Sequence, residues 1–417
     1  MTEGLVVSIE KRDRMFKLLK RQPFNTQLRE RYDTYKSQIK ILCRKAERCY
    51  FETRFKHFHG DGRRTWGTIN EALKRKKSKA KAPQQLYTEN GEKITDKTEI
   101  SEHFNRYFTN IGQNLSSKFG PNTNPKKYDF KPENVIRSFT SISSADVTKH
   151  LKNLDIRKSP GVDKIHPKLL REAAHVVTEP LTYIFNLSIT KDIVPSKLKS
   201  ARILPIFKGT GNPELPGNYR PISILPACSK ILEKIIYNQM IQILGDDCLF
   251  ERQYGFRRGL GTTEAIRNLV DGLHKSLHAG NINIGIFIDF KKAFDTVNHE
   301  ILINKLEGYG FTGVAKRWLE DYLKNRNQMV KINNKPSSKL SVKVGVPQGS
   351  ILGPLLFLLY INDMKEYIKH GTWQLFADDT NIFYNTKDIE IAIIEIHEDM
   401  VGLNKWLEEN KLTVNTS

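Results

Sequence analysis

The 417-residue sequence predicts an α+β protein. Apolar residues three and four apart, as in 26–56 and 98–118, are typical of amphipathic helices. Short runs rich in Ile and Phe, such as 283–289 and 374–383, are typical of strands. The predicted strands all lie after residue 200, and helical patterns surround them. The length suggests two or three domains.

The charge of the chain is strongly positive. The net charge is +21, and the first 100 residues carry 25 Lys/Arg against 13 Asp/Glu. Such a surplus indicates a polyanionic partner, most simply nucleic acid. The alternative is a hydrated basic surface that serves solubility.

Cysteine usage and hydropathy indicate an intracellular protein without a membrane segment. The four cysteines form no CxxC pair, and free thiols suit a reducing compartment. Residues 1–14 lack the apolar core of a signal peptide. The most apolar run, 351–361, is too short to span a bilayer.

The N-terminal region is predicted to be a helical, basic extension. The helix over 26–56 presents Lys and Arg between its apolar positions, so it could lie on nucleic acid, form a coiled coil or cap the next domain. Residues 74–83 form a basic stretch typical of an exposed linker with phosphate affinity. A second linker, 120–131, follows the helix over 98–118. We therefore divide the chain into an extension, 1–131, and a second domain, 132–417.

The second domain begins with helices and a hairpin. Residues 144–192 predict two or three helices broken at 159–161. Strands at 201–208 and 218–224 predict a hairpin with Lys208 and Arg220 near its loop. A helix capped by Ser229 should follow and end at Gly245.

Two strand ends carry carboxylates. The strand over 283–289 is apolar on both faces, which predicts a central strand, and it ends at Asp289. The segment 374–383 predicts a hairpin with Asp378 and Asp379 at its turn. Adjacent anions in an apolar setting are costly unless a cation neutralises them, and oxygen ligands suit Mg²⁺. A simple Asp-Asp turn is the alternative. If Asp289 meets the hairpin, the carboxylates could hold two Mg²⁺ ions about 3.5–4 Å apart, as in phosphoryl transfer.

The segment GVPQGS, 345–350, lies between these carboxylates and leads into an apolar helix from Ile351 to about Met364. Its glycines permit close backbone approach to a ligand, and Gln348 offers a donor and an acceptor. A Pro/Gly turn that only starts the helix is equally compatible.

These segments together resemble a known family. In order, FIDFKKAFDTV (287–297), GVPQGSILGP (345–354) and FADDTNIF (376–383) resemble the palm of reverse transcriptases. LPIFKGTGN (204–212) and NYRPISILP (218–226) resemble the fingers, and QYGFRRG (253–259) and WLEENKLTVN (406–415) continue the pattern. The likeness is greatest to non-LTR (LINE-type) retrotransposons of the jockey kind or a neighbouring clade. It covers residues 200–417, and more loosely 20–190.

The resemblance implies an RNA-directed DNA polymerase with a right-hand fold: an antiparallel palm sheet backed by helices, with fingers on its N-terminal side. Asp289, Asp378 and Asp379 would bind two Mg²⁺, or Mn²⁺, ions. Lys208 and Arg220 would bind the incoming triphosphate, and Gln348 would position template or nucleotide. Phe294 would be the aromatic gate that excludes a ribose 2′-hydroxyl. Asp295 would be structural.

The implied partners are an RNA template, a DNA primer and dNTPs, in the cytoplasm or the nucleus. The chain ends at Ser417, so the resemblance implies fingers and palm without a thumb, and no segment resembles the endonuclease of such elements. Two alternatives stay open. One is a domesticated or decayed nucleic-acid-binding protein without turnover. The other is an RNA-dependent RNA polymerase, which Phe294 and the PQG segment disfavour.

Overall fold

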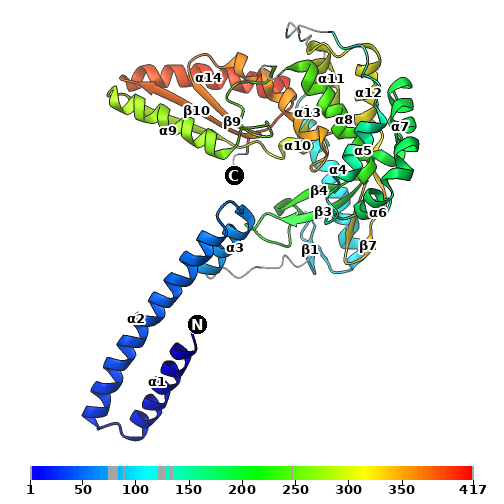
Figure 1. Ribbon diagram of the computed structural model, residues 1–417. Helices are drawn as coiled ribbons and strands as arrows, with labels where there is room; N and C mark the ends of the chain where they lie inside the picture. The colour runs from blue at the N-terminus through cyan, green and yellow to red at the C-terminus, as the bar shows by residue number, and fades with distance from the viewer. Residues whose placement is uncertain are drawn as a thin grey trace. The chain divides into compact units, whose positions relative to one another are not determined.

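A computed structural model describes residues 2–73, 83–88, 90–120, 128, 130, 135–245 and 248–415. The chain divides into two compact units, Met1–Lys81 and Ala82–Ser417 (Figure 1). Each unit is described by itself.

The first unit is helical. It contains α1 (Glu3–Arg21), α2 (Thr26–His57) and α3 (Gly62–Ala72). The predicted helix over 26–56 is confirmed as α2, and the Asn25 side chain caps it by accepting from the Leu28 amide at 3.0 Å. Phe16 of α1 stacks on Tyr32 of α2 with ring centroids 5.6 Å apart. The apolar face of α2 is fully buried only at Ile39. Residues 74–82 of the predicted basic linker lie outside the described residues.

The second unit mixes helices with short sheets, which confirms the α+β prediction. Its helices are α4 (Lys97–Ser116), α5 (Ser144–Lys152), α6 (Pro167–Glu172), α7 (Ala174–Thr190), α8 (Ala227–Leu244), α9 (Thr262–His278), α10 (Ala293–Thr296), α11 (His299–Gly308), α12 (Gly313–Leu323), α13 (Leu352–Ile361) and α14 (Ile389–Glu409). Short 3₁₀ helices are η1 (Ser196–Lys199), η2 (Pro216–Asn218) and η4 (Asn362–Tyr367). The strands are β1 (Leu86–Tyr87), β2 (Lys93–Ile94), β3 (Ser200–Phe207), β4 (Tyr219–Ile224), β5 (Ile282–Ile288), β6 (Arg326–Ile332), β7 (Lys335–Pro336), β8 (Leu340–Val342), β9 (Thr372–Phe376) and β10 (Asp379–Thr386).

A five-stranded sheet is built around β3 and β6. The order is β4-β3-β6-β7, with β8 also paired to β6. The predicted hairpin is confirmed as the antiparallel pair β3–β4, whereas β3 and β6 run parallel. Helix α4 covers this sheet and buries Phe104 against Tyr219, with ring centroids 5.0 Å apart. Helix α4 therefore packs within the second unit, although the sequence grouped it with the N-terminal extension.

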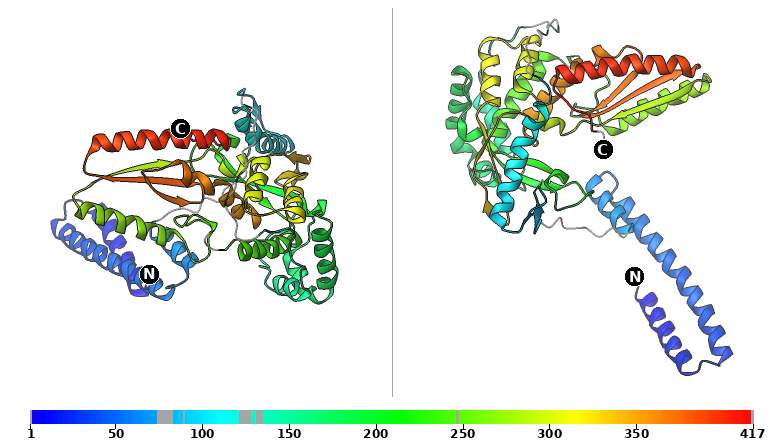
Figure 2. Two further views of the ribbon diagram at one scale, coloured as in Figure 1. Left: turned by 90° about the horizontal axis from the view of Figure 1, so that it is seen from above. Right: turned by 180° about the vertical axis from the view of Figure 1, so that it is seen from behind.

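A three-stranded antiparallel sheet has the order β5-β10-β9 and lies between α14 and α9 (Figures 1 and 2). Tyr384 of β10 donates to Asp399 of α14 at 2.9 Å on one face. On the other face Gln374 of β9 donates to the Ala265 carbonyl of α9. The prediction that 283–289 is a central strand is wrong. The centre is β10, β5 is at the edge, and the Phe287 side chain is 72% exposed.

The largest core surrounds α13, in which nearly every residue is buried. The predicted apolar helix from Ile351 to about Met364 is divided into α13 and the tighter turn η4. Helices α8, α11 and α14 pack around this segment. None of the described helices is long and apolar enough to cross a membrane.

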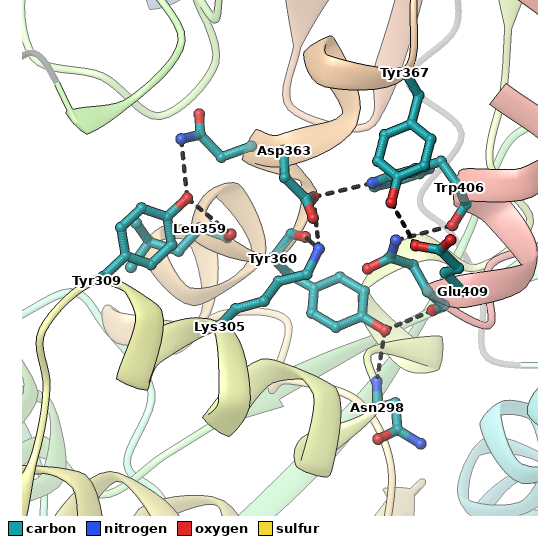
Figure 3. Close-up of polar contacts among 11 residues, drawn as sticks. Asn298, Lys305, Tyr309, Leu359, Tyr360, Asp363, Tyr367, Trp406 and Glu409 are labelled. Carbon is teal, nitrogen blue, oxygen red and sulfur yellow. Dashed lines mark hydrogen bonds and ion pairs between the residues drawn. The ribbon is translucent and has the colours of Figure 1, made fainter. Parts of the chain in front are cut away.

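A buried polar network joins α11, η4 and α14 (Figure 3). The Lys305 ammonium donates to the Asp363 carboxylate and to the Tyr360 carbonyl at 2.6 and 2.5 Å. The Trp406 indole donates to the same Asp363 oxygen at 2.9 Å, and the Tyr360 hydroxyl donates to the Asn410 carbonyl at 2.6 Å. Because Lys305 is fully buried and Asp363 is 2% exposed, removing either charge leaves the other without compensation.

This network predicts a large, specific loss of stability. Lys305→Met should lower the free energy of unfolding by about 3–5 kcal/mol, since it leaves an unpaired buried carboxylate. Lys305→Met/Asp363→Asn should recover most of that loss, because the amide still accepts from Trp406. The control is Lys316→Met, which removes the exposed ion pair to Glu307 and should cost below about 1 kcal/mol. Urea unfolding checks the series, and a Lys305→Met protein as stable as the control would contradict it.

Candidate active site

The pairing of β5 with β10 brings the predicted carboxylates together. The last paired residues are Thr380 and Ile288, so the next step along the register places Asp379 beside Asp289. Ile288 and Thr380 are buried, whereas Asp289 and Asp379 are exposed on the opposite face. The sheet therefore presents the two carboxylates side by side toward solvent.

Asp378 lies in the tight turn between β9 and β10. Asp379 pairs with Phe376, which leaves Ala377 and Asp378 as the two loop residues. Asp378 is half-buried, and its pKa is raised by burial and by the charges of Asp379 and Asp289, while the charge of Arg220 opposes the rise. The three carboxylates therefore lie within electrostatic range of one another.

The three carboxylates are suitable ligands for a hard cation, but their side chains do not form a closed metal site. Within the described ranges, no group of three or more His, Cys, Asp and Glu side chains has the geometry to hold a metal ion. The like-charge repulsion at Asp378 is nevertheless the condition that a divalent cation relieves, and carboxylate oxygens are ligands that Mg²⁺ prefers. The residues present thus fit a magnesium site.

Residues after α14 hold the end of β5. The Asn415 side-chain amide donates to Asp289 Oδ2 at 2.9 Å, and its backbone amide donates to the Asp289 carbonyl at 2.8 Å. The Lys291 amide donates to the Thr413 carbonyl at 2.8 Å. Sequence analysis gave Asn415 no role, although it lies within the motif segment 406–415.

Cationic side chains lie on the hairpin across from the carboxylates. Lys208 and Arg220 are exposed on β3–β4, as predicted. The sequence analysis missed Lys292, which donates to the Gly217 and Tyr219 carbonyls at 3.0 and 3.3 Å. Burial, together with the positive charges of Lys208 and Arg220, lowers the pKa of Lys292 to about 8. The three cations therefore converge on one region.

Phe294 lies at the start of the short helix that follows β5. Its ring stacks on the buried Phe357 with centroids 4.4 Å apart and meets Phe256 edge-on at 6.0 Å. The side chain is half-buried, so one part contacts the core and another part remains accessible. These contacts are compatible with both a gate and a core aromatic.

Gln348 is paired with Asp295. Its side-chain amide donates to Asp295 Oδ1 at 2.9 Å, and its carbonyl accepts from the Ser223 amide of β4 at 2.7 Å. Gly349 has φ +111°, and a Cβ there would lie 2.7 Å from the Ser223 carbonyl oxygen. The sequence predicted that the backbone at this glycine lies close to a ligand; in the structure it lies close to the backbone of β4.

Asp295 carries a partly uncompensated buried carboxylate. Its Oδ2 has no hydrogen-bond partner among the described residues. Burial raises the pKa of Asp295 to about 6, against the opposing influence of Lys292 and Gln348. A carboxyl whose pKa is higher in the folded chain binds its proton more tightly there. Its contribution to stability is therefore complete below about pH 4 and is lost as the pH rises through about 6.

Asp295→Asn should consequently stabilise the protein at neutral pH. The asparagine still accepts from Gln348 and cannot ionise, so the gain should be about 1–3 kcal/mol at pH 7.5 and should shrink toward pH 4.5. Urea unfolding at several pH values measures the free energy of unfolding of Asp295→Asn and of the unmodified chain. A gain independent of pH, or a loss at pH 7.5, would rule out this explanation.

The region that contains these residues is similar in sequence to known proteins. The family model for reverse transcriptase (RNA-dependent DNA polymerase) matches residues 206–417. The chain is 31% identical over 281 residues to a probable RNA-directed DNA polymerase from transposon BS of Drosophila melanogaster, covering 65% of this chain and 31% of the relative. It is 26% identical over 327 residues to the RNA-directed DNA polymerase from mobile element jockey of the same species, covering 73% of this chain and 35% of the relative. It is 29% identical over 287 residues to the probable RNA-directed DNA polymerase from transposon X-element, also of that species, covering 67% of this chain and 31% of the relative.

The chain spans about a third of the length of each of these relatives. The matched region contains the carboxylates at the β5–β10 edge, the hairpin cations and the Gln348 loop. Non-LTR elements were the relatives predicted from the motifs, and the similarity to jockey, BS and X-element polymerases confirms that prediction. The chain belongs to the reverse transcriptase (RNA-dependent DNA polymerase) family.

Proposed function

We propose that this chain carries the fingers and palm of an active RNA-directed DNA polymerase. The sheet β5-β10-β9 with α9 and α14 would be the palm, and the sheet around β3–β4 the fingers. The observation that carries the proposal is the arrangement of charge. Asp289, Asp378 and Asp379 gather at one sheet end, and the charge of Arg220 influences both Asp378 and Lys292.

Each group has a role in this proposal. Asp289, Asp378 and Asp379 would hold two Mg²⁺ ions, which supply Lewis-acid activation of a primer 3′-hydroxyl and neutralise charge on the leaving pyrophosphate. Lys208 and Arg220 would bind the triphosphate of the incoming dNTP, and Lys292 would hold the end of their hairpin. Gln348, oriented by Asp295, would contact template or nucleotide. RNA template, DNA primer and dNTPs would be the partners, at an intracellular site.

A nucleic-acid-binding protein without turnover is the second candidate. The net charge of +21 favours it, because a strongly basic chain can bind a polyanion without catalysing any reaction. Primer extension on poly(rA)/oligo(dT) with purified full chain separates the two functions. Incorporation of dTTP that requires Mg²⁺ supports the polymerase, whereas RNA binding without incorporation supports the second candidate.

The carboxylates give the first test of the mechanism. Asp289→Asn and Asp378→Asn should each reduce extension by about a hundredfold or more, because a metal ligand is lost. RNA affinity should change little, since the side chains keep their shape. The melting temperature should not fall, since each change removes one of three repelling charges. Asp271→Asn, which neutralises an exposed carboxylate on α9, is the control and should retain activity. Extension that survives both active-site changes would refute the assignment.

Phe294 gives a test of sugar selection. Phe294→Val should open space for a 2′-hydroxyl and lower the ratio of kcat/KM for dNTP over rNTP by about tenfold, about 1.4 kcal/mol. Because the ring also stacks on Phe357, stability should fall by about 1–3 kcal/mol.

Phe357→Leu separates these two effects. Phe357 is fully buried beneath Phe294, so this change should cost stability and leave the sugar preference unaltered. Steady-state kinetics with both nucleotides and thermal unfolding of both variants provide the comparison. Equal selectivity in the two variants would show that Phe294 is a core aromatic only.

A further inference from the structure

The turn that carries Asp378 has an unusual backbone. Ala377 has φ +56°, in the left-handed region that glycine adopts readily and alanine adopts at a cost. In this turn φ is positive at Ala377 and not at Asp378, and a two-residue hairpin turn with a positive φ at its first position alone ordinarily contains glycine there. Such a conformation persists when the surrounding contacts determine it, and residues of this kind are concentrated at functional sites.

The surrounding contacts come from the segment 252–255. The Leu375 amide donates to the Arg252 carbonyl at 3.0 Å, and the Tyr254 amide donates to the Leu375 carbonyl at 2.8 Å. Gln253 thus lies parallel to Leu375 as an added bridge at the free edge of β9. Residues 253–255 of this segment begin the motif QYGFRRG, to which the sequence analysis assigned no role.

The Gln253 side chain reaches the turn itself. It is 2% exposed, and its Oε1 accepts from the Ala377 amide at 2.8 Å and from the Gly255 amide at 2.9 Å. Its Nε2 lies 3.4 Å from the Ala377 carbonyl oxygen and donates to it. The two N–H donors determine the orientation of the side-chain amide, since a flipped amide would place its NH₂ group against both.

The adjacent Gly255 permits this contact. A Cβ at Gly255 would lie 2.3 Å from the Ala377 nitrogen and 3.0 Å from its Cα. Backbone and side chain of 253–255 therefore close around the peptide unit of Ala377, immediately before Asp378.

We propose that Gln253 is a positioning residue for Asp378 and Asp379: its amide holds the Ala377–Asp378 turn and so determines where the two carboxylates present their oxygens. The inference rests on the proposed polymerase function for its catalytic consequence. Its structural part, that the Gln253 oxygen holds the Ala377 amide, is testable without any reaction. Gln253 touches neither substrate nor metal in this assignment.

The test compares two buried glutamines that contact the same hairpin. Gln253→Met removes the acceptor from the turn. Gln374→Met is the matched control, because Gln374 is 8% exposed on β9 and donates to α9, away from the turn. Hydrogen–deuterium exchange at residue resolution in the metal-free full chain should show faster exchange of the Ala377 amide, by tenfold or more, in Gln253→Met alone.

Metal binding and kinetics then test the catalytic part. In Gln253→Met, Mn²⁺ affinity measured by electron paramagnetic resonance should fall severalfold, and kcat for primer extension should fall about tenfold or more. The KM for dNTP and the Kd for primer–template should stay within about twofold. These effects are expected because misplaced carboxylates impair the chemical step and leave the substrate contacts intact. Gln374→Met should lose comparable thermal stability but keep its Mn²⁺ affinity and kcat.

Several outcomes overturn the proposal. Equal exchange at Ala377 in the two glutamine variants does so, as does a Gln253→Met protein with unaltered Mn²⁺ affinity and kcat. If Gln253→Met does not fold, Gln253→Glu decides, because its carboxylate keeps both acceptor contacts. Exchange at Ala377 should then stay within about threefold of the unmodified chain, and faster exchange overturns the proposal. If the unmodified chain extends no primer, the polymerase proposal fails, and exchange and Mn²⁺ binding still decide the role of Gln253.

Discussion

The pairing of β5 with β10 is the constraint on which the site depends. Side chains alternate between the faces of a sheet, so a slip of one residue would reverse every side chain of the strand. Ile288 and Ile382 are buried on the core face, and their burial selects the register. The same register places Asp289 beside Asp379 on the other face. The hydrophobic effect on one side of the sheet thereby positions the charges on the opposite side.

Gathering like charges has an electrostatic cost that the chain offsets only in part, through the charge of Arg220 near Asp378 and the hydrogen bond from Asn415 to Asp289. The pKa of Asp378 is raised and the pKa of Lys292 is lowered, each by burial first and by neighbouring like charge second. Within the described residues no ion pair joins Lys208, Arg220 or Lys292 to the three carboxylates. In the proposed function, the carboxylates would bind cations, and Lys208 and Arg220 would bind phosphates.

The scaffold around the site is polar as well as apolar. Lys305, Asp363 and Trp406 fix the C-terminal part of α14 to the core (Figure 3). The chain after α14 then reaches Asp289 through the side chain of Asn415. On the other side Gln253 holds the turn before Asp378. Buried hydrogen bonds of this kind are directional, so they specify position more sharply than apolar packing does.

The sequence by itself determined the α+β class, the β3–β4 hairpin, helix α2 and the identity of Asp289, Asp378, Asp379, Lys208 and Arg220 as site candidates. These follow from short-range periodicity and from motifs in which each residue is a few positions from its neighbours. Only the tertiary structure decided that β5 is an edge strand, that α4 packs on the five-stranded sheet, and that Gln348 pairs with Asp295. It alone brought Gln253 to Ala377 and Asn415 to Asp289. Those contacts join residues more than 100 positions apart, and periodicity along the chain carries no information about which distant side chain will be the partner.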